Sequence, residues 1–304
     1  MSSKTRTLLL LHLAVFLAGW TGIFGRVISL DGLPLVWYRV LIALPVLLGV
    51  LALTGRLHRS SRGAVLRFSA LGILLALHWV AFYESIQTSN VSVGVACIAT
   101  SCFFSALFEP LLSRRRMRWA ELLISFIAIA GILLIFSLDV RYRTGILWGL
   151  VSAAVYSVFA ILNIQAGERT GEDSATMLLW ELAGSVVFLS LCVPLYARLR
   201  GEAVPVPQGA DLWALPILGS VLTVIPFLLQ IHALRHLSAF TVNVAYNLEP
   251  VYSIIFAALL FGETREVGLS FWAGLALVVL SVWLQTRRIR LSLLQAQDSP
   301  DTPF

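Results

Sequence analysis

The sequence predicts an all-α integral membrane protein in which ten transmembrane helices form two inverted five-helix repeats. Hydrophobic residues make up 59% of the 304 residues and charged residues only 12%, whereas a soluble protein carries about 25% charged residues. The apolar residues gather in ten long runs, and weak internal similarity relates the first five runs to the last five. An apolar excess of this size indicates surfaces that face lipid.

Each run is long enough to cross a bilayer as a helix, which takes about 20 mostly apolar residues. The predicted spans are Thr7–Gly25, Leu33–Thr54, Ala64–Ile86, Val91–Leu112, Trp119–Leu138, Gly145–Gln165, Ala175–Leu195, Leu212–Leu234, Ala239–Phe261 and Val267–Gln285. We expect residues 1–138 to form the first repeat, residues 139–290 the second, and residues 291–304 a disordered cytoplasmic tail.

The basic residues predict how the spans are oriented. The first run follows Lys4 and Arg6, as in a signal peptide, but it has no convincing cleavage site, so we interpret it as an uncleaved first helix. Most of the 22 Lys and Arg residues fall in the connectors that would be cytoplasmic if the N-terminus is cytoplasmic. Because cytoplasmic loops are enriched in basic residues, we expect a multi-pass protein of the cell (inner) membrane with both termini cytoplasmic.

The internal repeat predicts that the two halves are inverted. The stretch LGILLALHWV from Leu71 aligns with LGSVLTVIPF from Leu218, and SNVSVGVACIATS from Ser89 aligns with SAFTVNVAYNLEP from Ser238. Five spans are an odd number, so the second half must enter the membrane in the opposite orientation. Inverted repeats are typical of transporters that alternate access around a site near the bilayer midplane.

Two stretches carry a resemblance to a known family. NLEPVYSIIFAALLFGE, from Asn247 to Glu263, and LPLVWYR, from Leu33 to Arg39, are similar to the ninth and second spans of the EamA family of the drug/metabolite transporter superfamily. The resemblance implies a ten-helix fold and export of amino acids, metabolites or other small solutes. The chain departs from the family pattern in the fourth span, where Cys102 replaces the usual proline and Pro110 follows, so we expect the kink to be displaced.

Polar residues inside the spans are candidates for a substrate path, because polar groups in a bilayer are expensive and commonly functional. In the ninth span, Asn243, Tyr246, Asn247 and Pro250 share one helical face. Pro250 frees the carbonyl of Tyr246, and freed backbone groups are tolerated only where protein or water satisfies them. We expect this face to look into a cavity; polar contacts between helices are the alternative.

The other candidates come from the first, third and sixth spans. Trp20 and Tyr156 occupy equivalent positions of the two repeats, and His78 lies near the middle of its span among aromatic residues. Packing or an interfacial aromatic belt is the alternative role for these side chains. Together, the predicted substrate-binding residues are Trp20, His78, Tyr156, Asn163, Asn243, Tyr246, Asn247 and Glu249.

Arg39, Glu181 and Pro250 are assigned structural or hinge roles. Arg39 could extend to the interface, contact an anion or form an ion pair between helices. Glu181 is its counterpart in the second repeat, but inversion would place it at the opposite side of the membrane, so no direct Arg39–Glu181 pair is expected. We expect Glu109, Glu121 and Glu263, near the ends of spans, to contact water.

Other classes of site lack their motifs. The sequence contains no G-x-S-x-G, H-E-x-x-H, P-loop or dinucleotide fingerprint. The five histidines are scattered, and Cys97, Cys102 and Cys192 lie in apolar runs. No catalytic residue, metal or cofactor is therefore predicted. Nucleic-acid binding is not expected either, because the basic residues lie in connectors between spans.

The sequence therefore predicts a transporter rather than an enzyme. We expect it to export small organic solutes, such as amino acids or related metabolites, by alternating access, with a small-molecule substrate and membrane lipid as partners. The chain is expected to be a monomer or homodimer. Proton coupling through Glu249 or His78 and uncoupled facilitation both remain open. The alternative function is that of an intramembrane lipid-modifying enzyme or a lipid scramblase.

Overall fold

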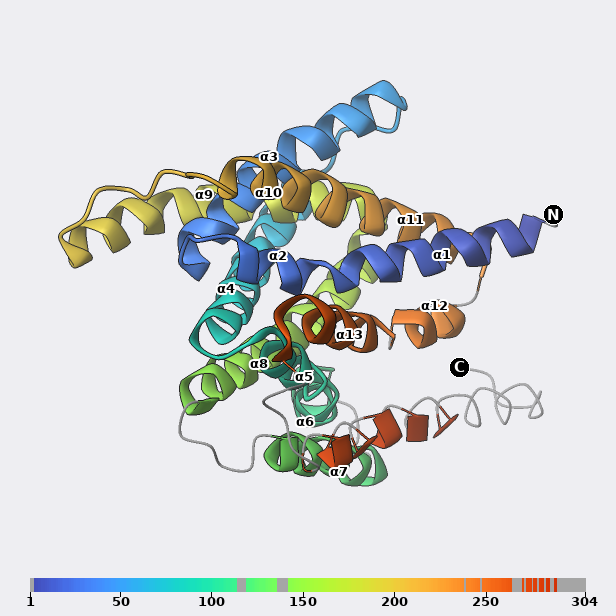
Figure 1. The fold of residues 1–304 in the computed structure, drawn as a ribbon. Helices are drawn as coiled ribbons and strands as arrows, with labels where there is room; N and C mark the ends of the chain where they lie inside the picture. Colours follow the sequence, from blue (N-terminus) through green and yellow to red (C-terminus); the bar gives the residue numbers. More distant parts are fainter. Residues whose placement is uncertain are drawn as a thin grey trace, which may run out of the picture.

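The protein is a bundle of α-helices in the computed structural model (Figure 1). The structure describes residues 3–113, 119–135, 142–237, 239–246 and 248–263, with shorter stretches at 270, 272–274, 276–277, 279–281, 283–284 and 287–288; within these ranges there is no strand. The helices are α1 (Ser3–Gly19), α2 (Thr21–Val27), α3 (Gly32–Leu53), α4 (Arg62–Thr88), α5 (Val91–Ile98), α6 (Ser101–Ser113), α7 (Trp119–Ile135), α8 (Arg143–Thr170), α9 (Ser174–Arg200), α10 (Asp211–Pro216), the π-helix η2 (Ile217–Val224), α11 (Ile225–Leu234), α12 (Ala239–Tyr246) and α13 (Glu249–Phe261).

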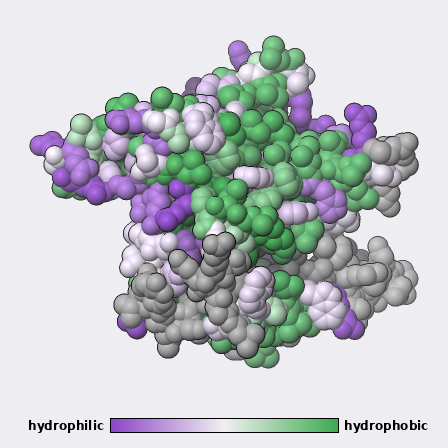
Figure 2. Space-filling model, in the orientation of Figure 1, coloured by the Kyte–Doolittle hydropathy of each residue, from purple (hydrophilic) through white to green (hydrophobic). Residues whose placement is uncertain are grey.

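Seven helical stretches of the described chain are long and apolar enough to cross a membrane, judged by length and composition. They are Thr5–Val27, Gly32–Leu53, Arg62–Thr88, Val91–Ser113, Arg143–Thr170, Ser174–Arg200 and Asp211–Leu234. Their outer faces carry exposed apolar side chains such as Leu191, which is 71% exposed. Hydrophobic residues cover much of the middle of the face shown in Figure 2, and hydrophilic residues gather toward its ends. Such a surface matches a lipid environment.

The predicted spans agree closely with the observed helices wherever the structure describes them. The fifth predicted span corresponds to α7, which has 17 residues, and the ninth is divided into α12 and α13. The tenth predicted span, Val267–Gln285, and the predicted tail 291–304 lie largely or wholly outside the described residues. The all-helical membrane class is therefore confirmed, and the number of ten spans stays a prediction.

The fourth span corrects one expectation. Helix α5 ends at Ile98 and α6 begins at Ser101, so the break directly precedes Cys102, and Pro110 lies inside α6. Thr100 accounts for this position, because its hydroxyl donates a hydrogen bond of 2.6 Å to the carbonyl of Cys97. A side-chain hydroxyl that binds a nearby carbonyl competes with regular helical bonding. The prediction of a kink displaced to Pro110 is therefore wrong.

Helix α4 lies at the centre of the bundle and packs on α3, α5, α8 and α9. Two of its side chains, Phe68 and Tyr83, are among the largest that are fully buried. The approach of α4 to α9 depends on glycine: a Cβ on Gly184 would lie 2.0 Å from the carbonyl oxygen of Ser69, and one on Gly72 would lie 2.0 Å from that of Glu181. Small residues allow membrane helices to approach this closely.

Candidate functional site

Four of the predicted spans are interrupted in the part of the chain that the structure describes. The first breaks at Trp20 between α1 and α2, the fourth at Ala99–Thr100, and the ninth at Leu248, while the eighth contains the π-helix η2. Irregular backbone at membrane depth is tolerated where it is buried in protein or lines a water-filled space. Broken helices near the midplane commonly form the binding sites of transporters. The interruptions therefore mark the region in which to look for a site.

The ninth span restarts at the predicted proline. Helix α13 begins at Glu249, and Pro250 lies in its first turn, where the missing N–H of proline costs no helical hydrogen bond. Tyr246 ends α12, and its hydroxyl donates to the carbonyl of Pro226 at 3.4 Å. Asn247 and the side chain of Asn243 lie outside the described residues. The predicted hinge thus lies at an observed helix boundary, and its motion stays a prediction.

Trp20 packs where the first and ninth spans cross. Its ring stacks on Phe256, with centroids 4.5 Å apart. The two helices touch at Gly19, whose carbonyl accepts a hydrogen bond of 2.7 Å from Ser253, and a Cβ on Gly19 would lie 2.8 Å from that of Tyr252. Trp20 is partly exposed beside this crossing. Its ring therefore belongs to an aromatic cluster next to the break between α1 and α2.

His78 is fixed against α8. Its Nδ1 lies 3.1 Å from the carbonyl oxygen of Ser152 and 2.9 Å from the Ser152 hydroxyl, which donates to the His78 carbonyl at 2.9 Å. A carbonyl can only accept, so the first contact requires a hydrogen on Nδ1 and leaves Nε2 as the accepting nitrogen of the neutral ring. The imidazole also lies 4.9 Å from the Tyr156 ring, between centroids.

Arg39 does not extend to the surface, since it is only 5% exposed. Its Nε donates to Thr223 Oγ1 and one terminal nitrogen donates to the Tyr83 hydroxyl, both at 2.9 Å. The guanidinium carbon also lies 4.0 Å from the centre of the Trp79 ring, a cation–π contact. Arg39 therefore connects α3 to α4 and to η2, in a structural position.

Glu249 interacts electrostatically with several of the other candidate residues. Its carboxylate acts electrostatically on Arg39, on Tyr156 and on Tyr246. Tyr156 is 38% exposed although it contacts the buried His78 ring. His78 and Tyr156 are thus in ring contact, and Glu249 lies within electrostatic reach of Tyr156 and Tyr246. We call these four residues the central cluster.

Glu181 and Asn163 form a separate pair. The Asn163 side chain, on α8, faces the Glu181 carboxyl, on α9. Glu181 is 1% exposed, and neither its Oε1 nor the Oδ1 of Asn163 has a hydrogen-bond partner. Asn163 therefore pairs with a residue that the sequence assigned to a structural role, rather than with the central cluster.

Sequence reasoning missed two polar residues that hold the site. Ser152 orients His78, and Thr223 accepts from Arg39 while its own hydroxyl donates to the carbonyl of Leu218 at 2.6 Å. Thr223 lies in the π-helix η2, and π-helical turns often occur at functional sites. A single Ser or Thr in an apolar run is too common to have indicated either role.

Two further carboxylates bind backbone and hydroxyl groups at one end of the bundle. Glu263 accepts from the backbone N–H groups of Val91 and Ser92 at 3.1 Å each, and from the Ser92 hydroxyl at 2.6 Å. Asp211 accepts from the backbone and hydroxyl of Ser29, both at 2.8 Å. Glu263 was expected to contact water; it is partly exposed and also caps the start of α5, so it joins the end of the ninth predicted span to the start of the fourth.

The central cluster can bind a small solute through aromatic faces, an imidazole nitrogen and one carboxylate. Such a mixture suits a molecule with both apolar and polar parts. Among the described residues, no group of three or more His, Cys, Asp or Glu side chains could hold a metal ion.

Comparison with known proteins gives one family. The sequence model described as the EamA-like transporter family matches residues 5–137 and 143–287. The threonine/homoserine exporter RhtA of Escherichia coli K12 is 28% identical over 189 residues, which cover 60% of this chain and 59% of the exporter. The chain thus spans less than two thirds of that relative. UDP-uronic acid transporter 1 of Arabidopsis thaliana is 23% identical over 240 residues, 77% of each chain.

A solved crystal structure shares the fold. It superposes with a TM-score of 0.61 at 15% sequence identity, over 91% of this chain and 96% of the other. At this identity, the likeness concerns the arrangement of helices alone.

Proposed function

The chain belongs to the EamA-like transporter family, and from this premise we propose that it exports a small organic solute, such as an amino acid or a related metabolite, across the cell (inner) membrane by alternating access. The observation that carries the proposal is the ring contact between His78 and Tyr156, with Glu249 within electrostatic reach of Tyr156 and Tyr246, beside interrupted helices. Asn243 and Asn247 complete the predicted solute-binding face of the ninth span, with Pro250 as the hinge.

Two glycine contacts support the inverted repeat. A Cβ on Gly219 in η2 would lie 2.9 Å from the carbonyl oxygen of Arg39 in α3, and one on Gly72 in α4 would lie 2.0 Å from that of Glu181 in α9. In each case, the second predicted span of one half lies against the third predicted span of the other half. Contacts that match in this way are what two halves related by a pseudo-twofold axis would make.

The solute class follows from the chemistry of the site and from the relatives. Arg39 is already bound to Tyr83 and Thr223, so Glu249 is the charge that remains for a solute. A carboxylate beside aromatic rings favours a solute with an ammonium group, because both attract a cation. The relative named as a threonine/homoserine exporter supports the amino-acid class and the outward direction.

The proposal also covers the topology, the oligomeric state and the movement of the repeats. Both termini would be cytoplasmic, the chain would act as a monomer or homodimer within membrane lipid, and the second repeat would rock against the first around the central cluster. The lipid-modifying enzyme and the scramblase gain no support, because the matched family consists of transporters.

Counterflow in proteoliposomes tests the proposal. Vesicles preloaded with one solute from a panel of amino acids, nucleosides and sugars should accumulate the same labelled solute. Tyr156→Ala should raise the KM by about tenfold or more, a loss of about 1.4 kcal/mol in binding. Trp148→Ala is the matched control, since this aromatic residue also lies on α8 and is 41% exposed.

Tyr246→Ala and Asn247→Ala extend the test to the ninth span, where both should weaken counterflow more than the control. If all three site variants transport every accepted solute like the unaltered protein, the central cluster is not the binding site. If no solute of the panel shows counterflow, the proposed transport of these classes fails.

A further inference from the structure

Glu181 is a buried acid with an unsatisfied oxygen. Its side chain is 1% exposed, and Oε1 has no hydrogen-bond partner. The amide of Asn163 faces the carboxyl, and Oδ1 of that amide also has no partner. Among the described residues, these are the two buried side-chain atoms left in this condition. Both are acceptors, so one further hydrogen-bond donor is needed to satisfy them.

The packing holds Glu181 in this place. Its backbone lies directly against α4, where a Cβ on Gly72 would be 2.0 Å from the Glu181 carbonyl oxygen. The hydroxyl of Ser185 lies 2.7 Å from the carbonyl of Gly72 and 2.8 Å from that of Glu181, which joins the two helices. These contacts hold the Glu181 backbone against α4, and its side chain is buried in this conformation.

No cation offsets a charge at Glu181 in the part of the chain that the structure describes. The titratable and charged side chains of the neighbouring helices are Tyr38 and Arg39 on α3, Arg62, Arg67, His78, Tyr83 and Glu84 on α4, Arg143, Tyr156, Glu168 and Arg169 on α8, and His232 on α11. Arg39 is bound to Tyr83 and Thr223, and His78 is bound to Ser152. The polar side chain that interacts with the Glu181 carboxyl is Asn163, through a side-chain hydrogen bond.

An ionised carboxylate that is buried without a cation and with one oxygen unsatisfied is unfavourable, and such a group takes up a proton instead. A protonated carboxyl also supplies the missing donor, because its O–H can bind an acceptor such as Asn163 Oδ1. We propose that Glu181 is a proton-binding site, and that release of its proton is coupled to the transport step. The coupling rests on the proposed function; the site does not.

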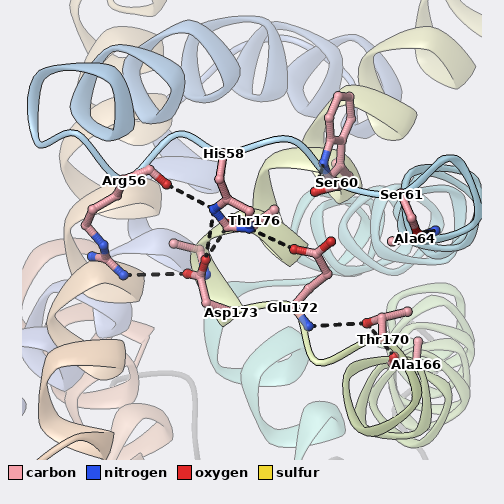
Figure 3. A network of polar contacts seen from close by, with 12 residues as sticks. Arg56, His58, Ser60, Ser61, Ala64, Ala166, Thr170, Glu172, Asp173 and Thr176 are labelled. Carbon is pink, nitrogen blue, oxygen red and sulfur yellow. Dashed lines mark hydrogen bonds and ion pairs between the residues drawn. The ribbon is translucent and has the colours of Figure 1, made fainter.

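Glu181 is nearer to the end of the bundle at which α9 begins. Glu181 lies about 10 Å along the helix from Ser174, at about 1.5 Å per residue. Its neighbour Trp180 donates to the hydroxyl of Ser60 at 3.2 Å, within the connector that carries His58. Figure 3 shows this connector, with His58 bound to Glu172 at 3.0 Å and Arg56 paired with Asp173 at 3.5 Å. Groups that exchange protons with water therefore lie at this end of the bundle.

The step itself is a reversible proton transfer. One carboxylate oxygen of Glu181 forms an O–H bond with a proton taken from water, and the same bond breaks when the proton returns to water. No oxidant, reductant or leaving group is required. When α4 and α9 move apart, the carboxyl becomes hydrated and the ionised form is no longer penalised.

Infrared difference spectroscopy tests the site without any solute. The purified full-length protein in lipid nanodiscs, titrated with acid and base, should show the carbonyl band of a protonated carboxylic acid at neutral pH. Glu181→Gln should remove one component of that band, whereas Glu84→Gln, on a partly exposed acid that accepts from the Gly32 N–H at 2.9 Å, should leave that component. If the unaltered protein shows no such band at neutral pH, or if Glu181→Gln leaves the whole band in place, the proton site is refuted.

Proteoliposomes test the coupling. With an accepted solute, an imposed pH gradient should change net transport several-fold. Glu181→Gln, which resembles the protonated acid, should keep counterflow and lose the response to the gradient. Counterflow without any effect of the gradient in the unaltered protein overturns the coupling but leaves the transporter standing. If transport responds to a sodium gradient instead, and Glu181→Gln loses that response, the site binds Na⁺ and the proposal of proton binding is refuted.

Discussion

The guanidinium of Arg39 donates to the hydroxyl of Thr223 at 2.9 Å. This bond joins α3 in the first half of the chain to η2 in the second half. Removing one partner of a buried charged group leaves the other unsatisfied, which costs about 1–3 kcal/mol.

We therefore expect Thr223→Val to lower the free energy of unfolding by about 1–3 kcal/mol. Thermal unfolding in detergent measures the change. Thr54→Val is the control, because the Thr54 hydroxyl binds Val50 within its own helix end and is exposed. Equal stability of Thr223→Val and the unaltered protein would show that the Arg39–Thr223 bond adds nothing.

Gly72→Ala should prevent close packing of α4 on α9. The new Cβ would lie 2.0 Å from a backbone oxygen of Glu181, so the helices must move apart, at a cost of about 1–3 kcal/mol or more. Gly49→Ala in α3 is the matched control, because nothing lies within 4 Å of its Cβ position and alanine is the better helix former. The yield of monodisperse protein and its thermal unfolding give the comparison. Similar behaviour of the two variants would contradict the packing.

Glu263→Ala should loosen the end of the bundle where this carboxylate caps α5. Loss of a helix cap costs about 0.5–2 kcal/mol. Cys97 ends the buried face of α5, so its reaction with a maleimide reports the loosening. With Cys102 and Cys192 replaced by serine, labelling of Cys97 should become several-fold faster.

Glu202→Ala serves as the control for that experiment, because Glu202 pairs only with Arg200 at an exposed position, at 3.7 Å. Labelling that is equally slow in both variants would show that the Glu263 cap does not hold this end closed.

His58 should titrate above its ordinary range. A hydrogen bond to Glu172, followed by one to the carbonyl of Arg56, raises the pKa of His58 above 6.5. The contact between the two loops is therefore fully present below pH 6.5 and is lost as the pH rises through the raised pKa. Nuclear magnetic resonance of labelled histidine should show this midpoint, and Glu172→Gln should lower it. An unchanged midpoint in Glu172→Gln would remove Glu172 as the cause.

The sequence predicted the spans well because their signal is local. A run such as that of α9 must be apolar along its whole length to lie in lipid, so composition alone locates Ser174–Arg200. The break at Leu248 was similarly indicated by Pro250, whose effect on a helix is also local.

The break at Thr100 and the partners of the site could not be predicted in the same way. Thr100, Ser152 and Thr223 act through single hydroxyl groups whose targets depend on how helices are placed in space. The separation of Asn163 from the central cluster likewise depends on which side of α8 meets α9. Only tertiary packing distinguishes these roles.

The two parts of three interrupted spans share some neighbours and differ in others. Helices α2, α5 and α13 pack on one another, whereas α6 packs on α7 and α8, and α12 packs on α1 and α11. A continuous rod would transmit any tilt from end to end. A jointed one lets its two parts tilt by different amounts, so one end of the bundle need not follow the other.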